Sequence, residues 1–232
     1  FSVPALQSGD PVRLYAVVDG KGQSPYTDAT VNYPGSGTEA DPYRVYTAAD
    51  LQGVYKKGYY KLMNDVDLTE WINKNSPKDG WPAIGKNGLT AVYFDGGGHT
   101  VSGLLCNTTA DYNGLFSNFP DGYIKNLNVK VAEGKEVKGG DRTGIVIGHF
   151  ANGIIDNVTA SGTVNGSKRC GGIVGVADNL KISSSKFDGT LKSDTTNAIL
   201  GGIVGEIQGG EITKSQASSK ITAKGDSTIA GA

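Results

Sequence analysis

The chain has 232 residues, 35 of them glycine, and a formal net charge of −1 at pH 7. This balance gives no electrostatic reason to expect nucleic acid or an anionic membrane as a partner, and eight prolines without a Gly-X-Y period exclude collagen. No apolar run reaches the roughly 18 residues of a membrane span. Because the chain starts at Phe1 without Met, we expect a processed or trimmed piece of a longer protein.

The first 36 residues differ in pattern from the rest. The segment Val12–Gly20 predicts a strand that ends in an Asp-Gly turn, and loop-like sequence follows it. We expect residues 1–36 to be the tail of a preceding domain, or a strand that covers the start of the next one. That next domain would extend over residues 37–232.

A short helix is predicted where the second domain begins. Thr47 and Asp50 have the spacing of a capping box, which indicates a helix over Ala48–Val54. A small helix at the start of a β-stack would shield the open end of the core from water and from edge-to-edge pairing.

Strands with candidate carboxylates follow the helix. Asp65 and Asp67 lie two residues apart on an alternating strand and so share a face, while "FDGGGHT" places Asp95 and His99 around a glycine turn. An enzyme of the β-helix type would need clustered carboxylates, either as an acid–base pair or as calcium ligands. We favour structural roles: a solvated outer face for Asp65 and Asp67, and a tight turn in which Asp95 accepts backbone N–H bonds and His99 pins the corner.

The second half of the chain is a repeat. The glycines that open each copy, from Gly114 to Gly231, are spaced by 30, 27, 30 and 30 residues. A second marker moves with them, at Ile124, Ile155, Ile182 and Ile212. Each unit holds short Val- and Ile-rich runs broken by Gly, Asn and Ser, which predicts three short strands a unit. A period of 27–31 residues then indicates an all-β fold, a parallel β-solenoid whose coils stack at about 4.8 Å with like residues over like.

The repeated Gly-Gly-Ile-Val-Gly is interpreted as a structural motif. Its Ile and Val supply a strand, and its glycines supply corners where φ is positive or where close contact between coils excludes a Cβ. A phosphate-binding loop would need a helix after the glycines, and none is predicted there. The glycines assigned to this structural role are Gly114, Gly144, Gly171, Gly172, Gly175, Gly201, Gly202 and Gly205.

The aromatic residues are unevenly distributed. All 11 Tyr and both Trp lie at or before Tyr123. One interpretation is irregular packing in the capping region. The other is a platform of exposed rings for a sugar or a protein, because aromatic faces bury a large area at little entropic cost. The rings considered for such a platform are Trp71, Trp81, Tyr93 and Tyr112.

Few other residues predict chemistry, and we expect no cofactor and no metal. Cys106 and Cys170 have no metal-ligand spacing and are expected to be free thiols. His149 is replaced by Val176 and Glu206 in the other copies, which argues against catalysis. The charged pairs before the repeat glycines are expected in solvated turns: Asp141-Arg142 and Lys168-Arg169.

Several of these segments occur together in one known group of proteins. In order they are "GTEADPYRVYTAADL", "YYKLMNDVDL", "WPAIG", "FDGGGHTVSGL", "NGLFS", "IKNL" and two copies of "GGIVG". From about Gly35 onward the chain resembles the GLUG-motif β-solenoid region of bacterial cell-surface, adhesin-like proteins. The resemblance implies a right-handed parallel β-helix on an exported, multi-domain protein, and it implies no catalytic residues. The chain departs from the pattern at Ser183-Ser184-Ser185, and the cut repeat at Ala232 implies further coils in the parent protein.

The function expected from these observations is non-enzymatic. The chain would be a rigid adhesin-like or spacer module on the bacterial cell surface, outer-membrane attached or secreted, and would bind a glycan or a surface protein weakly along an extended face. We expect a monomer without a membrane span in this piece. Two alternatives stay open: a β-helix lyase or hydrolase of acidic polysaccharides, which would gather Asp, Arg or Lys from successive coils on one face, and a pure scaffold.

Overall fold

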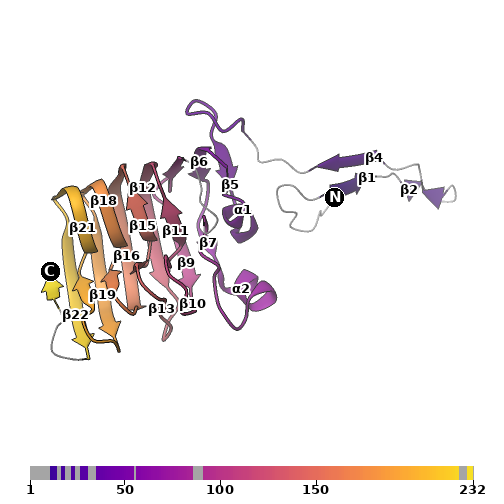
Figure 1. The fold of residues 1–232 in the computed structure, drawn as a ribbon. Coiled ribbons are helices and arrows are strands. Elements are labelled where there is room, and N and C mark those ends of the chain that lie inside the picture. Colours follow the sequence, from indigo (N-terminus) through magenta and orange to yellow (C-terminus); the bar gives the residue numbers. More distant parts are fainter. Residues whose placement is uncertain are drawn as a thin grey trace.

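The computed structural model describes residues 35–54, 56–85 and 91–224, and the backbone of short strands outside these ranges. Figure 1 shows a stack of β-coils with two helices at its N-terminal end. The chain is mostly β-strand and forms a parallel β-solenoid of about five turns, which confirms the predicted fold class. Within the described residues, no helix is long and apolar enough to cross a bilayer.

A sheet of 15 strands wraps around the stack, and every strand pair in it is parallel. A smaller sheet of four strands completes each later coil. The strands of the large sheet are β5 (Tyr43–Val45), β6 (Gly58–Leu62), β7 (Val66–Asp67), β8 (Val92–Asp95), β9 (Thr100–Leu104), β10 (Cys106–Asn107), β11 (Phe116–Phe119), β12 (Gly122–Val131), β13 (Val137–Lys138), β15 (Ile147–Ala151), β16 (Gly153–Asn165), β18 (Val174–Ser183), β19 (Lys186–Ser193), β21 (Val204–Thr213) and β22 (Gln216–Ala223). Those of the small sheet are β14 (Thr143–Gly144), β17 (Arg169–Gly171), β20 (Ile199–Gly201) and β23 (Ile229–Gly231).

Side chains of one kind form ladders along the stack, as the repeat predicts. Ile124 pairs with Ile155, which pairs with Ile182, which pairs with Ile212. The first three are completely buried, whereas Ile212, on the last coil whose side chains are described, is 42% exposed. The core is therefore a column of inward rows that each need a neighbouring coil on both sides.

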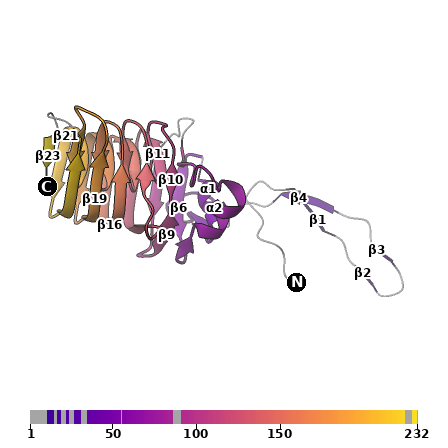
Figure 2. The ribbon, with the colours of Figure 1, turned by 90° about the horizontal axis from the view of Figure 1, so that it is seen from below.

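Two helices lie against the N-terminal end of this column (Figure 2). In α1 (Ala48–Gln52), the Thr47 hydroxyl accepts a bond from Asp50 N, and the Asp50 carboxylate accepts one from Thr47 N, so the predicted capping box is confirmed. The helix ends two residues earlier than predicted, with Gly53 as its C-cap. The sequence did not predict α2 (Thr69–Asn75), whose Ile72 is buried against the core.

The N-terminal strands pair among themselves. β1 (Pro11–Leu14) pairs with β4 (Thr27–Thr30), and β2 (Val17–Val18) pairs with β3 (Gly22–Gln23), both in antiparallel register. The predicted strand within residues 12–20 thus corresponds to parts of β1 and β2, and the predicted Asp-Gly turn at its end lies outside the described residues. The division of the chain at residue 36 stays a prediction.

The repeat glycines lie where the backbones of neighbouring segments approach each other. A Cβ on Gly175 would lie 2.5 Å from Arg142 C and from Gly148 O, and one on Gly205 would lie 2.6 Å from Gly175 O. Real Cβ contacts are longer than this, so any side chain here would push backbone segments apart. Neither glycine has a positive φ, so lack of space, and not backbone conformation, accounts for them. Cβ atoms would also be too close to their neighbours at Gly114, Gly144, Gly171, Gly172 and Gly201, while Gly202 accepts a bond from Gly172 N.

A different set of residues turns one corner of each coil. Asn126, Asn157, Ser184 and Lys214 occupy this corner in successive coils, all with φ between 49° and 54°. Asn157 Nδ2 donates to Asn126 Oδ1 (3.0 Å), and Asn126 Nδ2 donates to Asp95 Oδ1 (3.1 Å). The amide ladder stops at Ser184, whose side chain is a hydroxyl and not an amide.

Replacing Ser184 by asparagine should therefore stabilise the protein. Asn adopts positive φ more readily than Ser, and its amide can reach Asn157 as Asn157 reaches Asn126. We expect S184N to raise the free energy of unfolding by about 1 kcal/mol, the size of one hydrogen bond, in urea titrations followed by circular dichroism. S184V should lower it, because a β-branched residue is strained at this φ. A stability of S184N equal to or below that of the wild type would refute the ladder as a stabilising element.

Candidate ligand-binding surface

A row of apolar side chains lies on the outside of the large sheet. Tyr59 on β6, Tyr93 on β8 and Tyr123 on β12 are paired in register, and Ile154 on β16 follows them. Strand alternation places these side chains outward, because their neighbours Tyr60, Phe94, Ile124 and Ile155 are buried. We call Tyr59, Tyr93, Tyr123 and Ile154 the tyrosine stripe.

The rings of the tyrosine stripe contact one another along the stack. Tyr59 and Tyr93 are stacked with centroids 4.4 Å apart, and Tyr123 meets Tyr93 edge-on at 5.4 Å. Ile154 is 47% exposed, and the next two positions of the row are Lys181 and Glu211. Desolvation raises the pKa of Tyr93 and of Tyr123, so both hydroxyls are neutral at pH 7 and can donate as well as accept hydrogen bonds.

A second row, of charged residues, lies beside the stripe. Lys61, Asp95, Lys125 and Asp156 are paired in register, so their charges alternate in sign from coil to coil. Lys125 Nζ lies 3.7 Å from Asp95 Oδ2 and 4.5 Å from the centre of the Tyr123 ring. Asp95 Oδ1 accepts a bond from Gly97 N (2.9 Å), which confirms the predicted tight turn.

The two rows border a pocket of about 380 Å³ at the N-terminal side of the sheet. We call it the tyrosine pocket. Tyrosine faces and alternating charges give it apolar area together with hydrogen-bond donors and acceptors. Its lining residues are Glu39, Ala40, Pro42, Tyr59, Tyr60, Lys61, Asp95, Tyr123 and Lys125.

The four rings considered from the sequence do not form one platform. Tyr93 lies in the tyrosine stripe. Trp71 is partly buried and lines a separate cleft of about 350 Å³ beside α1 and α2, and Tyr112 lies in a loop under the guanidinium of Arg142, 4.6 Å away. The expected exposure of Trp81 is wrong: its ring is 1% exposed, and its Nε1 donates to Leu115 O (3.1 Å) in the core. This burial agrees with the alternative interpretation, aromatic packing in the capping region.

Tyr59 and Tyr123 were not singled out from the sequence, although their spacing from Tyr93 follows the repeat. Tyr123 directly precedes the repeat marker Ile124. Tyr93 lies 30 residues before Tyr123, and Tyr59 lies 34 residues before Tyr93. Extending the repeat upstream of Gly114 would have placed the three rings in one row.

The carboxylates considered for catalysis make turn contacts. Asp65 Oδ1 accepts a bond from Thr100 N (2.9 Å) and lies 3.3 Å from His99 Nδ1, so His99 holds a corner as expected. Asp67 Oδ1 accepts from Thr69 N (2.8 Å) at the start of α2. The bond from Thr100 lowers the pKa of Asp65, and bonds from Thr69 lower that of Asp67. Among the described residues, no three His, Cys, Asp or Glu side chains are grouped so that they could hold a metal ion.

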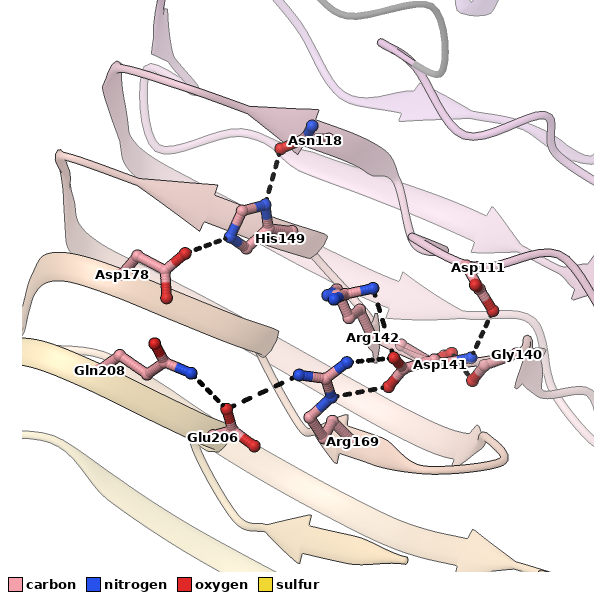
Figure 3. A network of polar contacts seen from close by, with 11 residues as sticks. Asp111, Asn118, Gly140, Asp141, Arg142, His149, Arg169, Asp178, Glu206 and Gln208 are labelled. Carbon is pink, nitrogen blue, oxygen red and sulfur yellow. Dashed lines mark hydrogen bonds and ion pairs between the residues drawn. The ribbon is translucent and has the colours of Figure 1, made fainter.

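Charged residues of three coils also meet on another face (Figure 3). Arg169 makes a two-pronged contact with Asp141, in which Nε donates to Oδ1 at 2.8 Å and Nη2 donates to Oδ2, and its Nη1 lies 3.6 Å from Glu206. Beside them, His149 Nε2 lies 2.8 Å from Asp178 and Nδ1 lies 2.9 Å from Asn118. We call Asp141, Arg142, Arg169 and Glu206 the arginine network.

The arginine network corrects one expectation. The side chains of Asp141 and Arg169 are only 13% and 22% exposed, so these residues do not lie in solvated turns, whereas Lys168 is exposed. They are covered because the loops that carry them pack on the outer face of the next coil, at Gly175 and Gly205. Since both arginines already bind carboxylates of the chain, the network leaves little unpaired charge for a ligand.

The two cysteines are unbridged and buried, as expected of free thiols. Burial raises the pKa of Cys106 and of Cys170 to about 12. Neither thiol is ionised at neutral pH, which does not suit a nucleophile.

Comparisons with known proteins relate the chain to parts of much longer proteins. It is 34% identical over 179 residues to Halomucin of Haloquadratum walsbyi, across 72% of this chain and 2% of that protein. It is 32% identical over 157 residues to an Evansella cellulosilytica protein provisionally named a Gly-rich membrane protein, across 63% of this chain and 17% of that one. It is 33% identical over 120 residues to the immunoglobulin A1 protease of Streptococcus sanguinis, across 49% of this chain and 6% of that protein.

A solved structure supports the fold. The crystal structure of a Bacteroides ovatus protein, provisionally described as an immunoglobulin A1 protease, matches 82% of this chain and 69% of its own with a TM-score of 0.52 at 20% identity. No protein-family profile matches the chain. The β-solenoid expected from the resemblance is thus confirmed, and its assignment to the GLUG group stays a prediction.

Proposed function

We propose that the chain is a non-enzymatic module of a cell-surface protein, of the GLUG-like, adhesin-like kind, and that it binds a glycan through the tyrosine pocket. The observation that carries this proposal is the tyrosine stripe beside a charged row of alternating sign. On the later coils the same outward row holds Lys181 and Glu211, so the fold does not require aromatic residues there.

The chemistry of the pocket fits a sugar ring. A pyranose has an apolar C–H face that packs on an aromatic ring, and hydroxyls around its edge that both donate and accept hydrogen bonds. Carboxylates such as Glu39 accept from hydroxyls, and ammonium groups such as Lys61 donate to them.

The location at a cell surface is supported by the relatives and by the fold. One relative is provisionally named a membrane protein, and the chain spans 17% of it, so this chain would be one segment of a larger surface assembly. A solenoid stacked in register is stiff along its axis and presents an extended face, as a spacer or adhesin needs. We expect it to act as a monomer.

The tyrosine stripe can be tested by substitution. We expect Y59S to weaken binding to the glycans recognised on an array by about tenfold or more, because Tyr59 lines the tyrosine pocket and its ring is a principal aromatic contact there. Y46S is the matched control, because Tyr46 is 43% exposed and lies outside the pocket. Thermal unfolding by circular dichroism would verify that both variants stay folded. Equal binding by Y59S and the wild type would refute the proposal, and a folded wild type that binds no glycan would favour the scaffold alternative.

A second function, cleavage of acidic polysaccharides, is favoured by two observations. Two carboxylates, Glu39 and Asp95, line the tyrosine pocket, and the arginine network gathers charges from successive coils. Against it, Asp95 is engaged by Gly97, Asn126 and Lys125. Incubation with acidic polysaccharides and calcium should release no new chain ends. Cleavage that is lost in D95N would replace the binding proposal by an enzymatic one.

A further inference from the structure

We propose that the tyrosine pocket binds the uncharged end of a glycan chain, and that the rest of the chain extends along the tyrosine stripe toward the C-terminal coils. This inference rests on the proposed function and adds to it a ligand class and a direction. It follows from the different construction of the two ends of the pocket.

The N-terminal end of the pocket is closed by the loop between Gly37 and Tyr43. Glu39, Ala40 and Pro42 of this loop line the pocket. The loop is attached to the sheet where Tyr59 N donates to Gly37 O (3.0 Å) and where β5 pairs with β6.

Hydrogen bonds within the loop fix its shape. Asp41 O accepts from Ser36 N (3.1 Å) and from Gly37 N (2.9 Å). The Asp41 carboxylate accepts from Ser36 N (2.9 Å) and from Arg44 Nη2 (3.1 Å), and Thr38 Oγ1 accepts from Asp41 N (3.2 Å). A loop braced in this way is a preformed wall, which a ligand would not have to order on binding.

Among the described residues, none of the coils after β12 lines the pocket. Its last lining residues are Tyr123 and Lys125 on β12. On the next coil the stripe continues with Ile154, whose side chain is 47% exposed, and the row then continues with Lys181. A ligand chain that continues past Tyr123 therefore meets an apolar contact on the next coil.

The size and charge of the pocket restrict what occupies it. A volume of about 380 Å³ lies at the small end of the roughly 300–1,000 Å³ of ligand sites. It therefore suits the end of a chain, since an internal segment would have to pass through the wall. The lining carries two carboxylates, Glu39 and Asp95, and two ammonium groups, Lys61 and Lys125, so its formal charge is 2 − 2 = 0. An uncharged terminal sugar meets donors and acceptors here without adding an unbalanced charge.

The number of protein molecules bound to each glycan chain tests this inference. The probes are neutral glucose oligomers of the α-1,4 and β-1,4 series and the polysaccharide of the same linkage, supplemented by array-positive neutral glycans, in calorimetry and sedimentation. End binding predicts one protein molecule per chain at every length, with an affinity that stops rising after the first few units. Several protein molecules on one long chain, or a preference for uronic-acid ends, would overturn the inference while leaving glycan binding intact.

A wall variant provides a second readout. Deletion of Glu39 and Ala40 should open the closed end and raise the number of protein molecules per long chain from one to several. Y46S, outside the pocket, should keep the wild-type ratio. An unchanged ratio in the folded deletion variant would overturn the role of the wall. Failure of every neutral glycan to bind the wild type would instead count against the proposed function itself.

Discussion

The substitution Gly175→Ala is expected to lower the free energy of unfolding by about 3 kcal/mol or more, at the upper end of the cost of overpacking. The new Cβ would lie 2.5 Å from Arg142 C, 2.5 Å from Gly148 O and 2.6 Å from Thr143 N. All three are backbone atoms of the preceding coil, so no side-chain rotation relieves the overlap. Relief requires the coils to separate, and separation breaks the parallel hydrogen bonds on both sides of the residue.

Urea unfolding followed by far-ultraviolet circular dichroism would measure this loss. Gly134→Asn is the matched control, since Gly134 has a φ of 66° that Asn tolerates and no atom lies within 4 Å of the place that a Cβ would take. We expect the control to change stability by less than about 1 kcal/mol. If Gly175→Ala were as mild as the control, the close approach of the coils would not be what the motif provides.

The stacking of the coils could be predicted from the sequence for a physical reason. In a parallel stack each inward row lies over the same row of the next coil, so one period recurs in every marker, as Ile124, Ile155 and Ile182 illustrate. For the motif glycines, the sequence predicted a structural role but left two possible reasons for it: a positive φ, or close contact between coils. Composition does not distinguish these causes, because both require glycine, and the structure assigns Gly175 and Gly205 to close contact.

The capping region was less predictable because it does not repeat. Trp71 and Trp81 are the same residue type in neighbouring segments of the chain. Even so, the Trp81 ring is buried in the core and Trp71 lies at a cleft. Their places depend on α2, whose short sequence carries no capping box. Burial of a ring in irregular structure follows from tertiary packing, and no local pattern encodes it.

The alignment of the tyrosine stripe could be predicted from the coil period, whereas the contacts of the arginine network could not. Tyr123 and Tyr93 follow the coil period, so register alone aligns them. Arg169 instead reaches Asp141 in the preceding coil and Glu206 in the following one, 28 and 37 residues away. These separations include loops of different lengths, so the contacts depend on how each loop folds over its neighbour.

Replacing Arg169 by glutamine should remove about 2 kcal/mol of stability at pH 7, because hydrogen bonds to charged groups contribute roughly 1.5–3 kcal/mol and the largely buried carboxylate of Asp141, 13% exposed in the wild type, would lose its two-pronged partner. Arg142, 3.3 Å away, would be its remaining cation. Arg44→Gln is the matched control: the pair that Arg44 forms with Asp41 is 41% and 45% exposed, and exposed pairs contribute about 0.2–1 kcal/mol.

The loss in R169Q should depend on pH. Burial by itself raises the pKa of Asp141, but the hydrogen bonds and charge of Arg169, together with Arg142, outweigh burial and hold this pKa below its ordinary value of 3.8. A carboxyl group with a lowered pKa in the folded state stabilises the protein above the pKa of the unfolded chain, and the contribution is lost as the pH falls through the folded-state pKa. The stability difference between wild type and R169Q should therefore be full at pH 7 and shrink below about pH 4. Urea titrations from pH 7 to pH 3 would measure it, and a difference that stayed constant over this range would show that Arg169 acts through packing instead of through its charge on Asp141.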